Sequence, residues 1–101
     1  MSYRYLFVPV QGDQKDLGIL TKPPSLEDLQ RYVGGYIEYV PEFYHSPDGG
    51  WAVIANGDGH ILNLTPNIKA MTMVGWKAPI PLVGDVVLCR KVKSYDPRKH
   101  A

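Results

Sequence analysis

What the sequence lacks narrows the classes of protein it can belong to. A single cysteine, Cys89, in 101 residues excludes an intramolecular disulfide and a zinc site built from several thiolates. Every apolar run is far shorter than the roughly 20 residues of a membrane-spanning helix. The apolar stretch within the first ten residues is too short and too aromatic for a secretory signal peptide, and it lacks a small-residue cleavage site. We therefore expect a reduced, cytoplasmic protein that does not engage a membrane.

Net charge of either sign is also nearly absent. Eleven Lys and Arg against ten Asp and Glu leave a formal charge of +1, which gives no overall attraction to a polyanion. What the chain does have is 45% hydrophobic residues, an ordinary proportion for a globular protein of this length. We predict one domain over residues 1–95 and a disordered basic tail over residues 96–101.

The spacing of apolar residues predicts an α+β fold, with a mostly antiparallel sheet of four to five strands and two short helices. Alternating side chains predict a first strand over residues 5–10, and residues 11–24 are expected to form a loop because they are polar and rich in glycine and proline. Residues 86–90 are apolar at both alternating positions, which is typical of a central strand. Three further strands are predicted from aromatic and β-branched runs, over residues 36–44, 51–56 and 60–64.

Both helices are predicted from their end signals. Ser25 is a favourable N-cap before an apolar stripe, and Gly34 can end that helix in the left-handed conformation. Thr65 followed by Pro66 predicts the start of the second helix, over residues 66–74. The core is predicted to contain Leu6, Val8, Leu29, Val33, Ile37, Val53, Leu62, Leu64, Ile68, Met71, Val86 and Leu88.

No set of reactive side chains converges in the sequence. The histidines and aspartates lack metal-ligand spacing, and Cys89 within an apolar strand is expected to pack as a small hydrophobic residue. Glu38 and Glu42 would share one face of a strand, where a pair of carboxylates is usually solvated. We therefore expect no catalytic residue, no metal and no cofactor, and we interpret the protein as non-enzymatic.

Two groups of residues are candidates for binding. The aromatic residues Tyr36, Tyr39 and Trp51 lie on neighbouring predicted strands, where flat rings with polar tips favour partner or base-stacking surfaces. The amides of Asn56 and Asn67 are expected to meet at one end of the sheet and to hold a small polar ligand there.

A third group of candidate residues is basic. Positive charge gathers near the end of the sequence although the total balances, and such a run can lie against phosphate. Its residues are Arg90, Lys91, Lys93, Arg98 and Lys99. A solvated tail explains the same residues equally well.

Four short motifs stand in order between about residues 25 and 90. They are Leu29-Gln30-x-x-Val33-Gly34-Gly35-x-Ile37-Glu38-x-Val40, Asn56-x-x-Gly59, Leu64-x-x-Asn67-x-x-Ala70 and Val83-Gly84-Asp85-Val86-Val87-Leu88. Together they resemble a family of short proteins of unknown function encoded by phages, plasmids and related mobile elements. The resemblance implies a genomic setting and a fold, but no mechanism.

From these observations we expect a binding module that acts on a host protein, such as a defence or regulatory factor, in the bacterial cytoplasm. Small size, the missing catalytic groups and the aromatic surface favour this interpretation. One alternative is sequestration of a small nucleotide-like ligand at Asn56 and Asn67. A second alternative is binding of single-stranded nucleic acid by the aromatic residues and the basic run.

Overall fold

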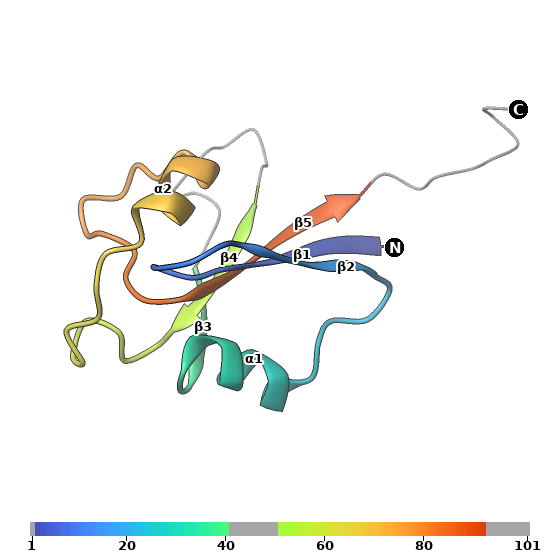
Figure 1. Ribbon diagram of the computed structural model, residues 1–101, viewed down its shortest axis with the longest axis horizontal. Coiled ribbons are helices and arrows are strands. Elements are labelled where there is room, and N and C mark those ends of the chain that lie inside the picture. The colour runs from blue at the N-terminus through green and yellow to red at the C-terminus, as the bar shows by residue number, and fades with distance from the viewer. Residues whose placement is uncertain (1, 41–50, 93–101) are drawn as a thin grey trace, which may run out of the picture.

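The computed structural model describes residues 2–40 and 51–92, and within them the predicted α+β fold is confirmed. One antiparallel sheet has the strand order β2-β1-β5-β4-β3. Its strands are β1 (Ser2–Val8), β2 (Lys15–Leu20), β3 (Ile37–Val40), β4 (Ala52–Asn56) and β5 (Val86–Val92). The helices α1 (Leu26–Val33) and α2 (Ile68–Val74) lie on opposite faces of this sheet (Figure 1).

The central position of β5 is explained by its composition. Val86, Val87 and Leu88 are all fully buried, so both faces of this strand are covered. β5 pairs with β1 on one side and with β4 on the other. The prediction of a central last strand is therefore confirmed. The first and last described strands, β1 and β5, are neighbours within the sheet.

α1 begins and ends where the sequence predicts. The Ser25 hydroxyl accepts a hydrogen bond from the Asp28 amide at 3.1 Å, which satisfies one of the free N–H groups of the first turn. Gly34 ends the helix with φ of 78°, a conformation that a residue without a Cβ adopts at little cost. Leu29 and Val33 face the sheet and are buried.

α2 has a different N-cap from the predicted one. The cap is Asn67, whose side chain accepts from the Ala70 amide at 2.9 Å, so Thr65 and Pro66 precede the helix. Ala70 and Val74 are buried, whereas Ile68, predicted to be in the core, is 67% exposed.

Each face of the sheet has its own hydrophobic core. Odd positions of β1 and β5 point to the α1 face and even positions to the α2 face, because side chains alternate along a strand. The α1-side core contains Tyr5, Leu29, Ile54 and Val87. The larger α2-side core contains Leu6, Val8, Val53, Ala55, Ala70, Val74, Leu82, Val86 and Leu88.

The predicted secondary structure is wrong for two segments. The expected loop over residues 11–24 contains the edge strand β2, which pairs with β1 around a bulge at Leu17 and includes Gly18 at φ of 96°. The expected strand over residues 60–64 is a series of turns, in which the Leu64 amide donates to the Gly59 carbonyl. Leu62, placed in the predicted core, is 56% exposed as a result.

Candidate functional site

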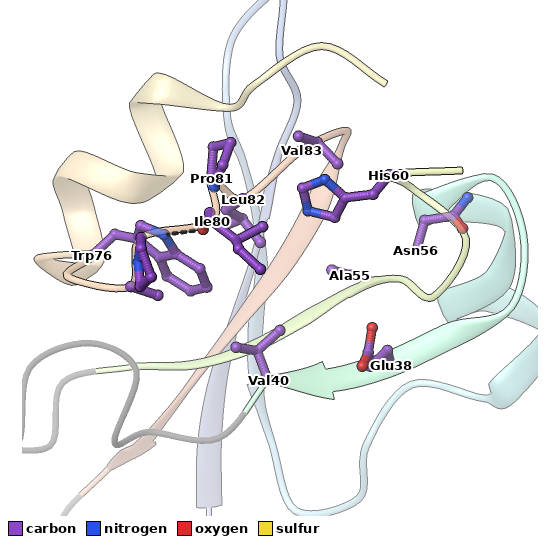
Figure 2. Close-up of a pocket in the computed structure, with 12 residues that line it drawn as sticks. Glu38, Val40, Ala55, Asn56, His60, Trp76, Ile80, Pro81, Leu82 and Val83 are labelled. Atoms are coloured by element: carbon purple, nitrogen blue, oxygen red, sulfur yellow. Dashed lines mark hydrogen bonds between the residues drawn. The ribbon is translucent and has the colours of Figure 1, made fainter. Parts of the chain in front are cut away.

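An apolar hollow of about 290 Å³ lies on the α2 face of the sheet, beside the edge strand β3. β3 and β4 form one wall, and residues 76–83, which we call the strap, form the other (Figure 2). The apolar side chains that line it include Val40, Trp76, Ile80, Leu82 and Val83. Concave apolar surfaces of this size are the usual location of binding sites in small proteins.

The strap holds its shape through few but well-placed contacts. The Trp76 indole nitrogen donates to the Ile80 carbonyl at 3.0 Å, closing a loop across the strap (Figure 2). At its far end, the Leu82 carbonyl accepts from the Asn67 backbone amide at 2.8 Å, and Val83 forms a bridge with Pro66. The strap is thus tied to the start of α2, and its prolines prevent it from joining the sheet.

Two titratable side chains lie at the hollow, and both come from the side opposite Trp76. Glu38 projects from β3 and His60 from the turns after β4, and Figure 2 shows both directed toward the space below the strap. Both residues are exposed. Among the described lining residues there is no serine, threonine, cysteine or lysine that could act as a nucleophile. The arrangement suits binding of an apolar group that carries a hydrogen-bond donor or a positive charge.

A second, more polar hollow of about 480 Å³ lies at the same end of the sheet. Its polar lining includes Gln11, Thr65 and Asp85. One oxygen of the Asp85 carboxylate already accepts from the Val10 amide at 2.8 Å, which fixes the chain leaving β1 against the start of β5.

Asn56, a predicted ligand residue, lines both hollows but its amide serves the fold. Its side-chain nitrogen donates to the Val33 carbonyl at 3.1 Å, and its side-chain oxygen accepts from the Asp58 amide at 2.8 Å. The side chain thus joins the last turn of α1 to the end of β4. Gly35 makes this approach possible, because a Cβ there would lie 3.0 Å from the Asn56 amide nitrogen.

Asn67, the other predicted ligand amide, is fully buried and lines neither hollow. Its side-chain nitrogen donates to the carbonyls of Val8 and Gly84, each at 2.9 Å. Both side-chain donors are thus used, and the side-chain oxygen accepts from the Ala70 amide at 2.9 Å. The structure therefore gives Asn56 and Asn67 separate positions and separate structural roles, and their ligand-binding role stays a prediction.

The predicted aromatic surface is divided by the sheet. Tyr36 is 73% and Tyr39 61% exposed. Tyr39 faces the α1 side, since its partner in β4 is Ile54. Trp51 instead packs against the core on the α2 side, where the Arg90 guanidinium lies over its ring at 5.6 Å from the centroid.

The predicted basic run is divided in the same way. Arg90 and Lys91 are neighbours in β5 and therefore point to opposite faces. Lys93, Arg98 and Lys99 lie outside the described residues. No single described surface thus contains all the candidates for nucleic-acid binding.

Residues from the sequence motifs pack closely against one another at one end of the sheet. A Cβ on Gly59 would lie 2.9 Å from Val83, and one on Gly84 would lie 2.7 Å from Leu64, so both glycines permit close contact between the turns and the start of β5. Gly84 also has φ of 81°. These contacts explain the motif positions by packing, without requiring a ligand.

The strap is the part of the site that the sequence does not indicate. The strap and His60 are not among the site residues predicted from the sequence, and Glu38 is predicted only as a solvated carboxylate. A tryptophan within a proline-interrupted apolar segment was the available signal. The pairing of the strap with α2 could not be read from spacing alone.

One buried titratable group lies on the other face of the sheet. Burial raises the pKa of the Tyr5 hydroxyl well above its usual value, and a hydrogen bond with Cys89, its neighbour across β1 and β5, acts in the same direction. Tyr5 therefore keeps its proton to a more alkaline pH than an unburied tyrosine. In residues 2–40 and 51–92, no three His, Cys, Asp or Glu side chains are grouped in a way that would hold a metal ion. Neither described helix is long and apolar enough to cross a membrane.

Residues 6–97 match the family described as Domain of unknown function (DUF3846), and the chain belongs to that family. No curated protein and no solved structure matches the chain. The expectation of an uncharacterised domain family is confirmed at this level. An origin in a phage or other mobile element stays a prediction.

Proposed function

We propose that the protein is a non-enzymatic binding module whose partner is a segment of another protein. The segment lies along β3 and places one side chain in the apolar hollow. The observation that carries this proposal is the hollow itself, an apolar space of about 290 Å³ beside the edge strand β3. Its walls offer apolar contact, and its described lining contains no serine, threonine, cysteine or lysine.

β3 supports the proposal because it is an edge strand. It pairs with β4 on one side, and no described strand pairs with its other side. An extended peptide can add to such an edge through main-chain hydrogen bonds, while alternate side chains enter pockets on one face. Glu38 and Val40 are the alternate residues of β3 that point to the α2 face and line the hollow.

Charge indicates which side chain the hollow accepts. Glu38 is exposed at the mouth and forms no ion pair with another described residue. A lysine or arginine can lay its aliphatic stem along the apolar walls and bring its positive end to this carboxylate. We therefore propose a partner segment with alternating β-branched residues and one basic residue. In keeping with the resemblance to mobile-element proteins, the proposed source is a bacterial host protein.

A displayed library of random peptides, selected on the immobilised full chain, tests this function. We expect enrichment of extended peptides with a lysine or arginine between β-branched residues. Ala78→Trp should abolish the enrichment, because the new ring fills the hollow from the irregular strap without altering a strand. Glu38→Arg should reverse the preferred charge, whereas Glu27→Arg, the same change on the exposed start of α1, should leave it unchanged.

Removing the charge of Glu38 without reversing it should have a smaller effect on peptide affinity. Glu38→Gln should weaken a selected basic peptide by up to about fivefold, the range for a solvent-accessible ion pair. Selection that yields no consensus, or a consensus that Ala78→Trp leaves intact, would contradict the proposal.

The alternative of a small nucleotide-like ligand receives less support. It requires donor groups near Asn56 and Asn67, and most of the hydrogen-bonding capacity of these amides is used within the fold. A thermal-shift screen of nucleotides tests it, since a ligand at a hundredfold excess over its Kd stabilises by about 2.7 kcal/mol.

A further inference from the structure

A row of four side chains, three exposed and one half-buried, crosses the sheet on the α2 face, at the end away from both hollows. In register, Ile19 of β2 lies opposite Arg4 of β1, and Arg4 lies opposite Arg90 of β5. Trp51, directly before β4, completes the row beside Arg90 at 5.6 Å. We call these four residues the arginine row.

α2 leaves the arginine row uncovered. The helix packs over the other end of β1 and β5, where Val8 and Val86 are fully buried (Figure 1). Arg4 and Arg90 are exposed, and Ile19 is 49% exposed. The described part of this end of the sheet therefore presents two guanidinium groups, a partly exposed indole ring and one aliphatic side chain on one surface.

The pairing of Arg4 with Arg90 is electrostatically unfavourable by itself. Like charges directly opposite one another on neighbouring strands repel and destabilise the pair. No ion pair with a described residue offsets this repulsion. By register the next carboxylate on this face is Asp16, opposite Leu6, and its oxygen accepts a hydrogen bond from the Gly18 amide. A bound anion between the two arginines would remove the repulsion.

We propose that the arginine row is a binding site for single-stranded nucleic acid. The two guanidinium forks hold backbone phosphate, for which their fixed geometry is well suited. The Trp51 ring offers its remaining exposed surface to a base, since every base has a flat face that stacks on an aromatic side chain. The site is separate from the apolar hollow and does not depend on the function proposed for it.

The residues of the arginine row are brought together by strand pairing and not by closeness in the sequence. The row includes Arg4, which lies 86 positions from Arg90 in the chain and reaches it only through the pairing of β1 with β5. It excludes Tyr39 and Lys91, which point to the other face. A sheet face that combines cations with an aromatic ring is a common platform for single strands.

The test measures binding of a fluorescent oligothymidylate of about 12 nucleotides to the full chain, by anisotropy over a range of salt concentrations. Each phosphate contact contributes about −0.7 to the slope of log K against log salt for a single strand. Arg4→Gln and Arg90→Gln should each weaken binding and make the slope less steep by about 0.7. Arg31→Gln, the same substitution at an exposed position of α1, should change neither quantity.

A spectroscopic measurement distinguishes stacking from simple charge attraction. The chain has two tryptophans, so Trp76→Phe leaves Trp51 as the source of indole fluorescence. Quenching on addition of the oligonucleotide, lost in the Arg4→Gln variant, supports the site. Three results would each overturn it: no binding at low salt, equal effects of Arg31→Gln and Arg90→Gln, or attachment to anionic lipid vesicles without affinity for the oligonucleotide.

Discussion

Replacing Asn67 should destabilise the protein more than any exposed substitution on α2. In Asn67→Ala the carbonyls of Val8 and Gly84 lose their donor, and the Ala70 amide loses its acceptor. All three bonds are made by a fully buried side chain, so water does not replace them without a structural change.

The magnitude follows from these three bonds. Loss of an N-cap costs about 1 kcal/mol. Each buried carbonyl left unsatisfied adds about 1 to 3 kcal/mol. The free energy of unfolding should therefore fall by about 3 to 7 kcal/mol, which is a large part of the total of about 5 to 15 kcal/mol for a domain.

Asn67→Asp separates the cap from the other two bonds. The carboxylate still accepts from the Ala70 amide, but it cannot donate to the two carbonyls, and a buried charge facing oxygen atoms is costly. The pKa of the introduced group should rise in the folded state. Its protonated form then fits better, so this variant should be more stable near pH 4 than near pH 7.

Urea unfolding, followed by tryptophan fluorescence and far-ultraviolet circular dichroism, measures these differences. Ile68→Ala is the matched control, because Ile68 is the next residue and 67% exposed, and it should change stability by less than about 0.5 kcal/mol. If Asn67→Ala costs less than about 1 kcal/mol, or no more than the control, the structural role assigned to this amide is wrong.

Three further predictions concern packing, burial and ionisation. Gly84→Ala should cost about 2 to 4 kcal/mol and Gly12→Ala only about 1 to 2, because both have positive φ but only the first Cβ would meet a leucine side chain, at 2.7 Å; equal losses by chemical denaturation would contradict the close contact. Leu88→Ala should cost about 2 to 5 kcal/mol, whereas Leu62→Ala should be nearly neutral since that side chain is 56% exposed, and thermal melting compares the two. Tyr5 keeps its proton in the folded state at a pH where the unfolded chain releases it, so stability should fall above about pH 10. Tyr5→Phe should reduce that alkaline loss, and an unchanged slope in unfolding free energy against pH would refute the assignment.

Local signals predicted those parts of the fold that depend on neighbouring residues. Ser25 and Gly34 define α1 because capping bonds join residues three to five positions apart. Residues 86–88 predicted a central strand, since a strand covered on both faces requires apolar residues at consecutive positions.

Features that depend on long-range pairing could not be predicted in this way. β2 forms because β1 offers it a partner edge, and its bulge and glycine conceal the alternating pattern. Residues 60–64 have strand-like composition, but no described strand pairs with them, and turn hydrogen bonds satisfy several of their backbone groups instead.

The candidate sites show the same limitation more strongly. Whether Tyr39 and Trp51 share a surface is decided by the register of β3 and β4, and the register places them on opposite faces. Likewise, Asn67 carries a polar group that suits a ligand, but its bonds to residues 59 and 17 positions away use it within the fold.

The position of β5 determines when the sheet can assemble. Residues 86–92 separate the β1-β2 pair from the β3-β4 pair, so no hydrogen-bonded ladder joins these halves until the last strand has been synthesised. A chain that ends before residue 86 contains both helices and two strand pairs, β1-β2 and β3-β4, but no ladder joins the pairs, and a two-stranded pair is marginal in water. Until β5 is in place, β1 and β4 keep open the edges that β5 later occupies, so a truncation before residue 86 is expected to remove the whole sheet rather than to shorten it.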